Sequence, residues 1–428
     1  MNEDATSRRA FVGGLTAASY QRVLGANERV QIGCIGCGII AGHHLSHLKP
    51  WPDVDLVAMC DAYLPRAEKY VADFSPKAKA CQDFRRVIDR GVVDVCLVCT
   101  PDHWHALPAI AAFQAGKDVY VEKPLATSIA EGRAMVEAAK RYQRVVQMGT
   151  QWRSGDHYRE AIETVQSGRL GKIRLIRAWA YLDWVGGIGH PPDGEPPAGV
   201  DYDLWLGPAP KRPFNKNRFH FNFRWFWDYA GGLMTDWAVH LLNLALWAMG
   251  PTPPLTVTSS GGKFVVDDNS ETPDTQMAVY DFPTHTLIWE HLMVGGVGPG
   301  NRPHGLSFTG TEATLIVDGD GWEVIPEPKK KKLRAFKRPV DPNDRGADGR
   351  PAHVRNFLDC TRSRQQPVTN LEVGHFVSTV AHLGNIALQS GSKIKWQPAE
   401  ERVEGLPETN MFITRAYRKP WTLPGGKS

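Results

Sequence analysis

One short segment places two side chains that suit proton transfer a single helical turn apart. Asp236 and His240 follow Gly231 and Gly232, and they are spaced i, i+4 in an expected helix over residues 235–249. They therefore share one face of that helix. Imidazole ordinarily titrates near working pH, which suits His240 to accept a hydroxyl proton, while the carboxylate can orient a substrate or raise the basicity of the ring. The same spacing would also occur if Asp236 only capped the helix and His240 were only a buried residue of the core.

A lysine at the end of an expected strand is the next candidate. Lys123 stands between Glu122 and Pro124, directly after the apolar run 118–121. A Lys that projects from a strand end can hold a substrate hydroxyl and stabilise alkoxide charge, and the proline prevents further strand pairing. A Lys-Pro pair by itself does not indicate any particular function. Taken together, Lys123, Asp236 and His240 are the candidate catalytic residues.

A glycine-rich turn is the strongest local pattern. Gly36-Cys37-Gly38-Ile39-Ile40-Ala41 lies between an apolar run and a helical pattern. Gly36 permits a tight turn, Gly38 lets the backbone approach a pyrophosphate at the helix N-terminus, and Ala41 permits close helix–strand packing. Asp61 can accept hydrogen bonds from both adenosine ribose hydroxyls and would repel a 2′-phosphate. The pattern predicts NAD rather than NADP as the cofactor, and a glycine loop with only a packing role is the alternative.

A second polar motif follows the fourth expected strand. Thr100-Pro101-Asp102-His103-Trp104-His105 would lie at the carboxyl edge of the sheet, where open α/β folds bind their ligands. The same residues are also typical of a capped helix start, and both interpretations can hold together. The predicted cofactor-binding residues are Gly36, Gly38, Ile39, Ile40, Asp61, Thr100, Pro101, Asp102, His105, Glu122 and Lys123.

The order of the expected elements places these motifs in space. From residue 30 to 150, apolar runs alternate with helical patterns, which predicts a Rossmann-type, doubly wound parallel sheet. The remainder, 151–428, has a helix followed by many strands, which predicts an α+β domain with a large, mostly antiparallel sheet and C-terminal helices. The expected strands of the first sheet are 30–35, 54–60, 93–99, 118–121 and 144–148.

Length and charge narrow the class of protein. A chain of 428 residues with 42% hydrophobic and 22% charged residues is typical of a globular protein with two to three domains. It contains no apolar run of about 18 residues, so no integral membrane span is expected. Seven basic residues between 329 and 338 account for the net charge of +4 and leave the rest slightly acidic. We therefore expect no nucleic-acid partner, and we expect the Pro-bounded stretch 326–351 to be a surface loop.

The cysteines favour buried thiols over a metal site. Cys34 and Cys37 flank the glycine turn, and Cys96 and Cys99 lie on an expected strand whose side chains alternate between faces. Neither CxxC pair suits a zinc site in that setting. We expect no bound metal.

The N-terminus carries a candidate export signal. Ser7-Arg8-Arg9-Ala10-Phe11-Val12 and the weakly apolar stretch 13–19 are similar to a twin-arginine signal. We expect residues 1–29 to be this signal and a linker, and the protein to be periplasmic. No clear small-x-small cleavage site follows, so a basic terminus on a cytoplasmic protein is the alternative.

The order of these motifs resembles the glucose-fructose oxidoreductase, inositol dehydrogenase and rhizopine-catabolism (Gfo/Idh/MocA) family, in its export-signal-bearing branch. The resemblance rests on Gly36–Ala41, Glu122-Lys123-Pro124, and the glycine pair with Asp236 and His240, and it covers nearly all of 30–428. The resemblance implies that Lys123, Asp236 and His240 are catalytic. It also implies an open C-terminal sheet that forms a homo-oligomer, a dimer or tetramer. The departures are Ile39, Ile40, Ala41 and Ala238, and none removes a catalytic group.

These observations predict an NAD-dependent oxidoreductase that transfers a hydride between nicotinamide and a sugar, polyol or related polyhydroxylated substrate. One alternative is an NAD-dependent glycosidase that acts by transient oxidation and elimination. An alternative of another class is a non-catalytic, cofactor-loaded sensor or partner-binding protein, against which the three candidate catalytic side chains argue. The candidate substrate-binding residues, which could stack on sugar rings or bind hydroxyls, are Arg153, Tyr181, Asp183, Trp184, His220, Arg224, Trp227 and Tyr229.

Overall fold

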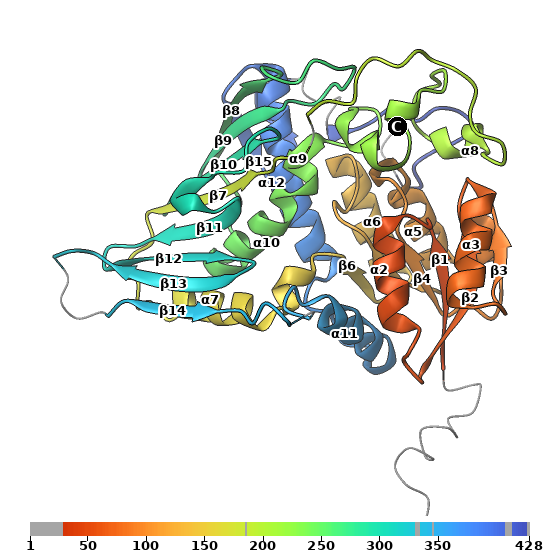
Figure 1. Cartoon of the computed structure of the whole chain (residues 1–428), viewed down its shortest axis with the longest axis horizontal. Coiled ribbons are helices and arrows are strands. Elements are labelled where there is room, and N and C mark those ends of the chain that lie inside the picture. Colours follow the sequence, from red (N-terminus) through yellow and green to blue (C-terminus); the bar gives the residue numbers. More distant parts are fainter. Residues whose placement is uncertain (1–28, 185, 330–333, 345, 407–412, 426–428) are drawn as a thin grey trace, which may run out of the picture.

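The protein has two domains whose sheets lie on opposite sides of a layer of helices (Figure 1). The computed structural model describes residues 29–184, 186–329, 334–344, 346–406 and 413–425. The candidate export signal and part of the basic run near residue 330 lie outside these residues. Within them, no helix combines the length and the apolar character that crossing a bilayer requires.

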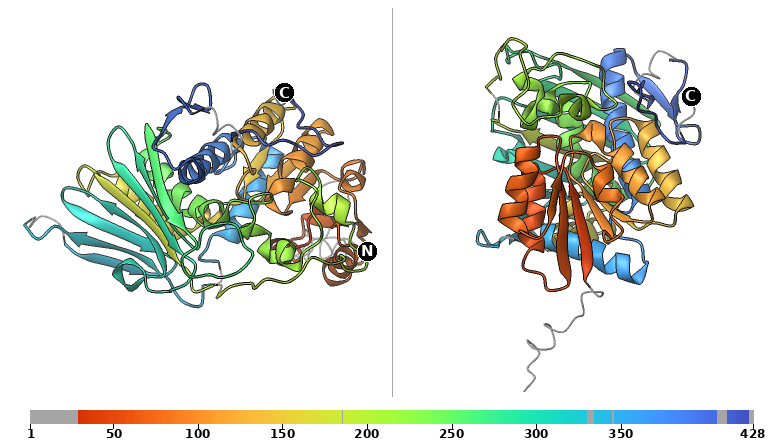
Figure 2. Two further views of the ribbon diagram at one scale, coloured as in Figure 1. Left: turned by 90° about the horizontal axis from the view of Figure 1, so that it is seen from above. Right: turned by 90° about the vertical axis from the view of Figure 1, so that its right-hand side faces the viewer.

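Six parallel strands form the first sheet, in the order β3-β2-β1-β4-β5-β6. Helices lie on both of its faces (Figure 2), so its central strands are buried on both sides, and all four residues of β4 are apolar. The strands are β1 (Val30–Ile35), β2 (Val54–Cys60), β3 (Lys79–Cys81), β4 (Val95–Val98), β5 (Asp118–Val121) and β6 (Val146–Met148). The helices between them are α2 (Ile39–Leu48), α3 (Leu64–Phe74), α4 (Arg85–Ile88), α5 (Ala106–Gln114) and α6 (Ile129–Arg141).

This arrangement confirms the expected Rossmann sheet. Of its six strands only β3, at the edge, was not predicted, because it has three residues, none of them fully buried, and no apolar run.

Ten strands form the second sheet, in the order β14-β13-β12-β11-β7-β10-β9-β8-β15-β16. Only the central pair, β7 with β10, is parallel, which confirms the expected mostly antiparallel sheet. The strands are β7 (Leu175–Tyr181), β8 (Thr256–Gly262), β9 (Thr275–Asp281), β10 (Thr286–Leu292), β11 (His304–Thr309), β12 (Ala313–Asp318), β13 (Gly321–Pro326), β14 (Phe336–Pro339), β15 (Ile394–Gln397) and β16 (Arg402–Val403).

Helices cover one face of this second sheet. They are α7 (Asp156–Gln166), α10 (Ala238–Met249) and α12 (Leu371–Ser390), and they lie between the two sheets. No helix of the described part of the chain covers the opposite face (Figure 2).

The expected surface loop over 326–351 is wrong in part. β14 pairs with β13 in antiparallel register, and Phe336 packs on Trp322 with ring centroids 4.9 Å apart. Arg338 forms an ion pair with Glu160 of α7. Because Glu160 neutralises Arg338 and Phe336 contacts Trp322 on the neighbouring strand, a strand forms despite the cluster of like charges.

Helix α11 (Arg350–Ser363) brings the C-terminal half of the chain back to the first domain. Its buried face belongs to the same apolar cluster as β1, β2 and α2. Arg355 and Arg362 form ion pairs with Asp53 at 2.9 and 2.7 Å. The residues that α11 buries in this cluster are Val354, Phe357, Leu358 and Cys360.

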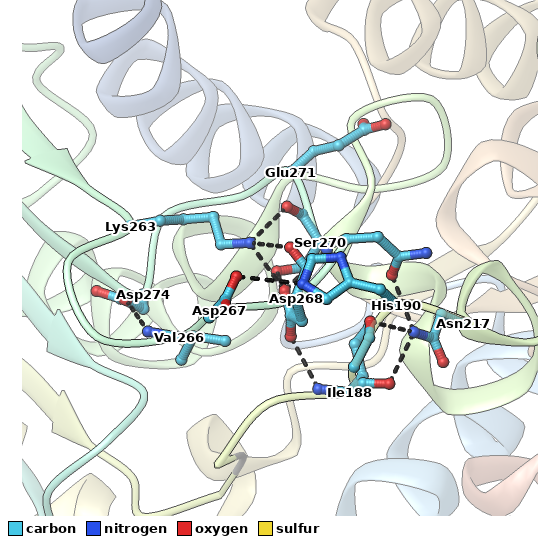
Figure 3. A network of polar contacts seen from close by, with 12 residues as sticks. Ile188, His190, Asn217, Lys263, Val266, Asp267, Asp268, Ser270, Glu271 and Asp274 are labelled. Carbon is cyan, nitrogen blue, oxygen red and sulfur yellow. Dashed lines mark hydrogen bonds and ion pairs between the residues drawn. The ribbon is translucent and has the colours of Figure 1, made fainter. Parts of the chain in front are cut away.

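A polar network joins three segments of the second domain, around Ile188, around Asn217 and from Lys263 to Ser270 (Figure 3). The Asp268 carboxylate, 1% exposed, accepts hydrogen bonds from the Ile188 amide at 2.8 Å, the Ser270 amide at 2.9 Å and Lys263 Nζ at 2.8 Å. Asn217 Nδ2 donates to the Ile188 carbonyl at 2.8 Å. Burial opposes ionisation of Asp268, but these donors outweigh it and lower the pKa of the carboxyl below its usual value.

Removal of the Asp268 carboxylate should destabilise the protein, because buried donors and the Lys263 ammonium would lose their acceptor. We expect Asp268→Ala to reduce the free energy of unfolding by about 2–4 kcal/mol, somewhat less than for a fully buried pair because Lys263 keeps 25% exposure. Urea unfolding followed by circular dichroism measures this. Asp267→Ala is the matched control, since that side chain is 99% exposed. Identical midpoints for the two variants would contradict the structural role of the network.

Candidate functional site

A cavity of about 740 Å³ lies at the carboxyl edge of the first sheet, where the second domain meets it. Its wall combines the β1–α2 turn, the ends of β2, β4 and β5, the aromatic segment 219–224 and the start of α10. Every residue predicted to bind the cofactor lines this one cavity, namely Gly36, Gly38, Ile39, Ile40, Asp61, Thr100, Pro101, Asp102, His105, Glu122 and Lys123.

The glycine turn leaves the N-terminus of α2 open to the cavity. Gly36 has φ +91°, and a Cβ there would lie 2.6 Å from the backbone of Cys99 and Thr100, so only glycine fits between β1 and β4. Gly38 is the N-cap of α2, and a Cβ there would meet nothing within 4 Å. No side chain caps this helix end and no acid lies in its first turn. The first amides of α2 can therefore hold a phosphate group.

Asp61 joins the end of β2 to the glycine turn. Its Oδ2 accepts a hydrogen bond from the Cys37 amide and its Oδ1 from the Tyr63 amide, both at 2.9 Å. Burial raises the pKa of Asp61, and these amides offset only part of that effect. Each carboxylate oxygen keeps a further lone pair for a ribose hydroxyl. Arg66, the nearby cation that could favour a 2′-phosphate, instead bonds the ring of His220 at 2.6 Å across the cavity.

A buried ion pair joins the two domains beside this turn. Lys123 follows β5, and its Nζ pairs with Oδ1 of Asp236, the last residue of α9 (Gly232–Asp236), and donates to the Asp236 carbonyl at 2.8 Å. Arg224 Nε donates to the same carboxylate at 3.3 Å. Burial alone would raise the pKa of Asp236, but the two cations hold it well below its usual range. The carboxylate is therefore ionised at neutral pH.

This lysine also explains a break in the expected helix over 235–249. The structure divides it into α9 and α10, with Trp237 between them in helical conformation. In a continuous helix, the Asp236 carbonyl would accept the His240 amide. Here that carbonyl accepts Lys123, and the His240 amide donates to the Trp237 carbonyl at 3.1 Å. Because Trp237 keeps helical backbone angles, α10 continues from α9, and Asp236 and His240 both line the cavity.

His240 is held as a neutral ring. Its Nδ1 is buried and has no hydrogen-bond partner among the described residues, and its ring lies against Trp152 with centroids 4.8 Å apart. Burial, reinforced by the Lys123 ammonium and opposed by Asp236, lowers the pKa of His240 to about 3. The expectation of a ring that titrates near working pH is wrong for this state, because the sequence did not show that an ammonium would share its pocket.

Three of the candidate substrate-binding residues line the cavity, namely Trp184, His220 and Arg224. The other five lie elsewhere. Arg153 donates to Asn243 Oδ1 at 3.0 Å and lies over Trp247.

Of the remaining four, Trp227 Nε1 donates to the Glu271 carbonyl at 3.1 Å, and Tyr229 is fully buried against Trp205. Tyr181 ends β7 and Asp183 is exposed just beyond it. None of these four lines the cavity.

Several cavity residues were missed by the sequence analysis. Trp152 and Trp237 face the candidate catalytic residues, and Phe221 packs edge-on to Trp184 with centroids 5.7 Å apart. The position of Trp237 between Asp236 and His240 could have revealed it. Arg350 follows no motif, and only the return of α11 to the first domain brings it to the cavity.

No group of three His, Cys, Asp or Glu side chains among the residues that the structure describes could hold a metal ion. The thiols of the two CxxC pairs are buried and free.

Comparison with family models identifies both domains. Residues 30–150 match the oxidoreductase family's NAD-binding Rossmann fold. Residues 171–283 and 320–423 match its C-terminal alpha/beta domain.

Curated relatives match mainly over the first domain. Inositol 2-dehydrogenase of Salmonella typhimurium (strain LT2) is 30% identical over 154 residues, which are 36% of this chain and 46% of that protein. A protein of Shewanella sp. (strain MR-4) named glycosyl hydrolase family 109 protein 1 is 28% identical over 154 residues, 34% of each chain. The chain thus matches less than half the length of either relative.

Solved structures share the fold over most of the chain. A levoglucosan dehydrogenase in complex with NADH and levoglucosan has a TM-score of 0.68 at 18% identity and covers 86% of this chain and 99% of its own. The WlbA dehydrogenase of Bordetella pertussis, in complex with NADH and UDP-GlcNAcA, has a TM-score of 0.66 at 20% identity, with coverage of 86% and 99%. Together with the family models, these matches show that the chain belongs to the Gfo/Idh/MocA family of oxidoreductases and carries its NAD-binding Rossmann domain.

Proposed function

We propose that the protein is an NAD-dependent oxidoreductase that transfers a hydride between nicotinamide and a sugar, polyol or related polyhydroxylated substrate. One observation carries the proposal. Lys123, Asp236 and His240 line the same cavity as the glycine turn and Asp61. Groups suited to hold a dinucleotide and groups suited to activate an alcohol therefore face one space.

The first domain would hold the cofactor. The amides at the start of α2 face the place of the pyrophosphate, and Asp61 that of the adenosine ribose hydroxyls. Thr100, Pro101 and Asp102 line the cavity after β4, and the resemblance to the family implies that they would contact the nicotinamide ribose. The bound cofactor supplies the acceptor or donor of the hydride.

The residues at the domain boundary would handle the hydroxyl and its proton. The Lys123 ammonium can donate a hydrogen bond to the substrate oxygen and stabilise its negative charge as the C–H bond is broken. Asp236 holds that ammonium in place. The His240 ring is neutral, with its pKa lowered to about 3, and it can accept the proton that leaves the oxygen as the negative charge developing on that oxygen raises the basicity of the ring.

The aromatic residues of the cavity suit a carbohydrate. Trp184 lies edge-on to Trp237 with centroids 5.8 Å apart, and Trp152 lies beside His240. Such faces stack on the C–H groups of sugar rings and exclude water from the reacting atoms. The named substrates of the two dehydrogenase structures, levoglucosan and UDP-GlcNAcA, are sugars as well.

Glycoside cleavage by transient oxidation and elimination is the second candidate. A segment of the second domain roofs the cofactor end of the cavity. Tyr63 bridges to Val200, the Leu64 amide donates to the Gly199 carbonyl at 3.1 Å, and Arg66 bonds His220. A cofactor covered in this way would exchange slowly, which would favour a reaction cycle that returns it to its starting oxidation state. The Shewanella relative bears a glycosyl hydrolase name.

A substrate panel tests both candidates. Purified protein is assayed for bound NAD, then incubated with free sugars, polyols and aryl glycosides while NADH and released phenol are followed by absorbance. Accumulation of NADH with a sugar or polyol supports the oxidoreductase. Release of phenol without net NADH supports the glycosidase. Bound NAD with neither reaction across the panel would contradict both and favour a non-catalytic, cofactor-loaded protein.

We also propose export by the twin-arginine route and assembly into a homo-oligomer. The sequence around Arg8 and Arg9 supports export, and the helix-free face of the ten-stranded sheet supports self-association through that sheet. Cell fractionation and light scattering test these proposals. A cytoplasmic monomer would contradict both.

Loss of Lys123 or His240 should abolish most turnover without loss of the cofactor. We expect Lys123→Ala and His240→Ala to reduce kcat on a confirmed substrate by about 10²–10⁴-fold, the usual contribution of a proton-transfer group. NAD should still bind, because neither side chain faces the adenosine or pyrophosphate. His190→Ala is the control, since that ring is 58% exposed and pairs with Asp267. Turnover equal to that of the unmodified protein in either cavity variant would overturn its role.

Asp61 should decide between the two nicotinamide cofactors. We expect the unmodified protein to bind NAD more tightly than NADP, because the carboxylate would repel a 2′-phosphate. Asp61→Ser should weaken NAD binding by about 10- to 100-fold, the contribution of hydrogen bonds to a charged group. It should also narrow the difference in affinity between NAD and NADP. Isothermal titration calorimetry with both cofactors measures this. Equal affinities in the unmodified protein would be the contrary result.

A further inference from the structure

We propose that Arg350, the first residue of α11, binds the phosphates of the dinucleotide, so that the C-terminal half of the chain supplies part of the cofactor site. This rests on the proposed function only for the binding of NAD and not for the reaction or its substrate. The residue lies far along the chain from the glycine fingerprint, and no motif in the sequence marks it.

The backbone before Arg350 is fixed against the cavity wall. Gly349 has φ +77°, and a Cβ there would lie 2.3 Å from the Gly155 nitrogen and 2.6 Å from the Gln151 carbonyl oxygen. The turn is therefore packed on the 3₁₀ helix of residues Gln151–Ser154, which carries Trp152 into the cavity. Position 350 is set by backbone packing and does not depend on the freedom of a loop.

The Arg350 guanidinium is mostly buried and has few partners. Its side chain is 18% exposed, and Nη2 pairs with Asp348 Oδ2 at 3.1 Å. Nε is buried with no hydrogen-bond partner among the described residues. A guanidinium has five N–H donors, so one carboxylate does not satisfy it. A buried cation of this kind, in the wall of a cavity, can gain further hydrogen bonds from an anion bound there.

The charge of Arg350 lies next to α2, whose N-terminus faces the same cavity. Arg350 and His43, in the second turn of α2, both line that cavity, as do Gly38 and Ile39. Burial lowers the pKa of His43, and the charge of Arg350 is the next cause. The guanidinium, whose charge acts on His43 and His47 of α2, and the first amides of that helix thus face the same cavity, in which the Rossmann fold holds a pyrophosphate.

Arg350 is the cation of this cavity best placed to bind an additional anion. NAD carries its negative charge on the pyrophosphate, and the planar guanidinium fork matches phosphate oxygens. Four other Lys or Arg side chains of the described residues line the cavity, and all four have partners. Lys69 pairs with Asp73, Lys123 and Arg224 share the Asp236 carboxylate, and Arg66 bonds the His220 ring. Of these five cations, Arg350 is the one with a buried nitrogen that has no hydrogen-bond partner in the described residues.

Titration of the full chain with ligand fragments tests this proposal. NAD, ADP-ribose and adenosine are each titrated into the unmodified protein, Arg350→Gln, Arg350→Lys and Arg355→Gln. We expect Arg350→Gln to weaken NAD and ADP-ribose by the same factor, about 10- to 100-fold, since both carry the pyrophosphate. Adenosine affinity should not change. Arg350→Lys should fall between, because it keeps the charge but not the fork.

Arg355→Gln is the matched control. Arg355 lies on the same helix, pairs with Asp53 and Asp359, and does not line the cavity. It should bind NAD as the unmodified protein does, which excludes a general effect of altering α11. Thermal unfolding of the apo variants reports whether each one folds.

Three results would overturn the proposal. Weaker NAD with unchanged ADP-ribose would place Arg350 at the nicotinamide. Unchanged affinity for both, with a raised KM only for acidic substrates, would assign it to a substrate carboxylate. An equal loss in Arg355→Gln would make the effect structural. Failure of the unmodified protein to bind NAD would instead contradict the proposed function, so the two failures are distinguishable.

Discussion

The contact between Lys123 and Asp236 is the interaction on which the geometry of the candidate site depends. The lysine belongs to the end of β5 in the first domain, and it meets both the carboxylate and the carbonyl of an aspartate in the second. Both side chains are largely buried, so each charge needs the other. Removal of one partner from such a pair typically costs about 3–5 kcal/mol, because the remaining charge is uncompensated. The pair therefore fixes where α9 and α10 stand relative to the first sheet.

The same contact sets the protonation state of the neighbouring histidine. His240 follows Asp236 by one turn, and the burial that the domain contact creates, together with the Lys123 ammonium, keeps its ring neutral. A neutral ring can accept a proton and a protonated ring cannot. Trp152 packs against one side of the ring, and in surroundings of low dielectric constant an ammonium stabilises an alkoxide more strongly than it does in water. The ionised Asp236 carboxylate and the neutral His240 ring are thus set by one shared environment.

The sequence predicted those parts of the protein that depend on local patterns. The bounds of β1, β2 and β5 match the expected strands 30–35, 54–60 and 118–121, because apolar runs of neighbouring residues define them. The break at Trp237 could not be predicted, because its cause is a lysine more than a hundred positions earlier in the chain. β14 lacks an apolar run, and it forms through Glu160 and Trp322, which lie on other elements.

The candidate substrate-binding residues show that residue type alone does not predict which side chains line the cavity. Trp184 and Trp227 have the same side chain, yet the first lines the cavity and the second donates its N–H to the Glu271 carbonyl. Arg224 and Arg153 differ in the same way, since one meets Asp236 and the other Asn243. Motif spacing identified the residues that lie at strand ends, because the carboxyl ends of parallel strands meet at one edge. It could not do so for residues delivered by loops and by packing between domains.

Helix α11 shows why the cofactor cavity belongs to the whole chain. Its apolar face completes the core of the first domain, while its first residue reaches the cavity wall. The roof over Tyr63 comes from the second domain, and the glycine turn from the first. A ligand that contacts all three binds only when the domains are docked. Because such a ligand stabilises the state it binds by RT ln(1 + [L]/Kd), a bound dinucleotide would stabilise the docked arrangement and, with it, the Lys123–Asp236 contact. The path of the chain would therefore couple cofactor binding to the Lys123–Asp236 contact.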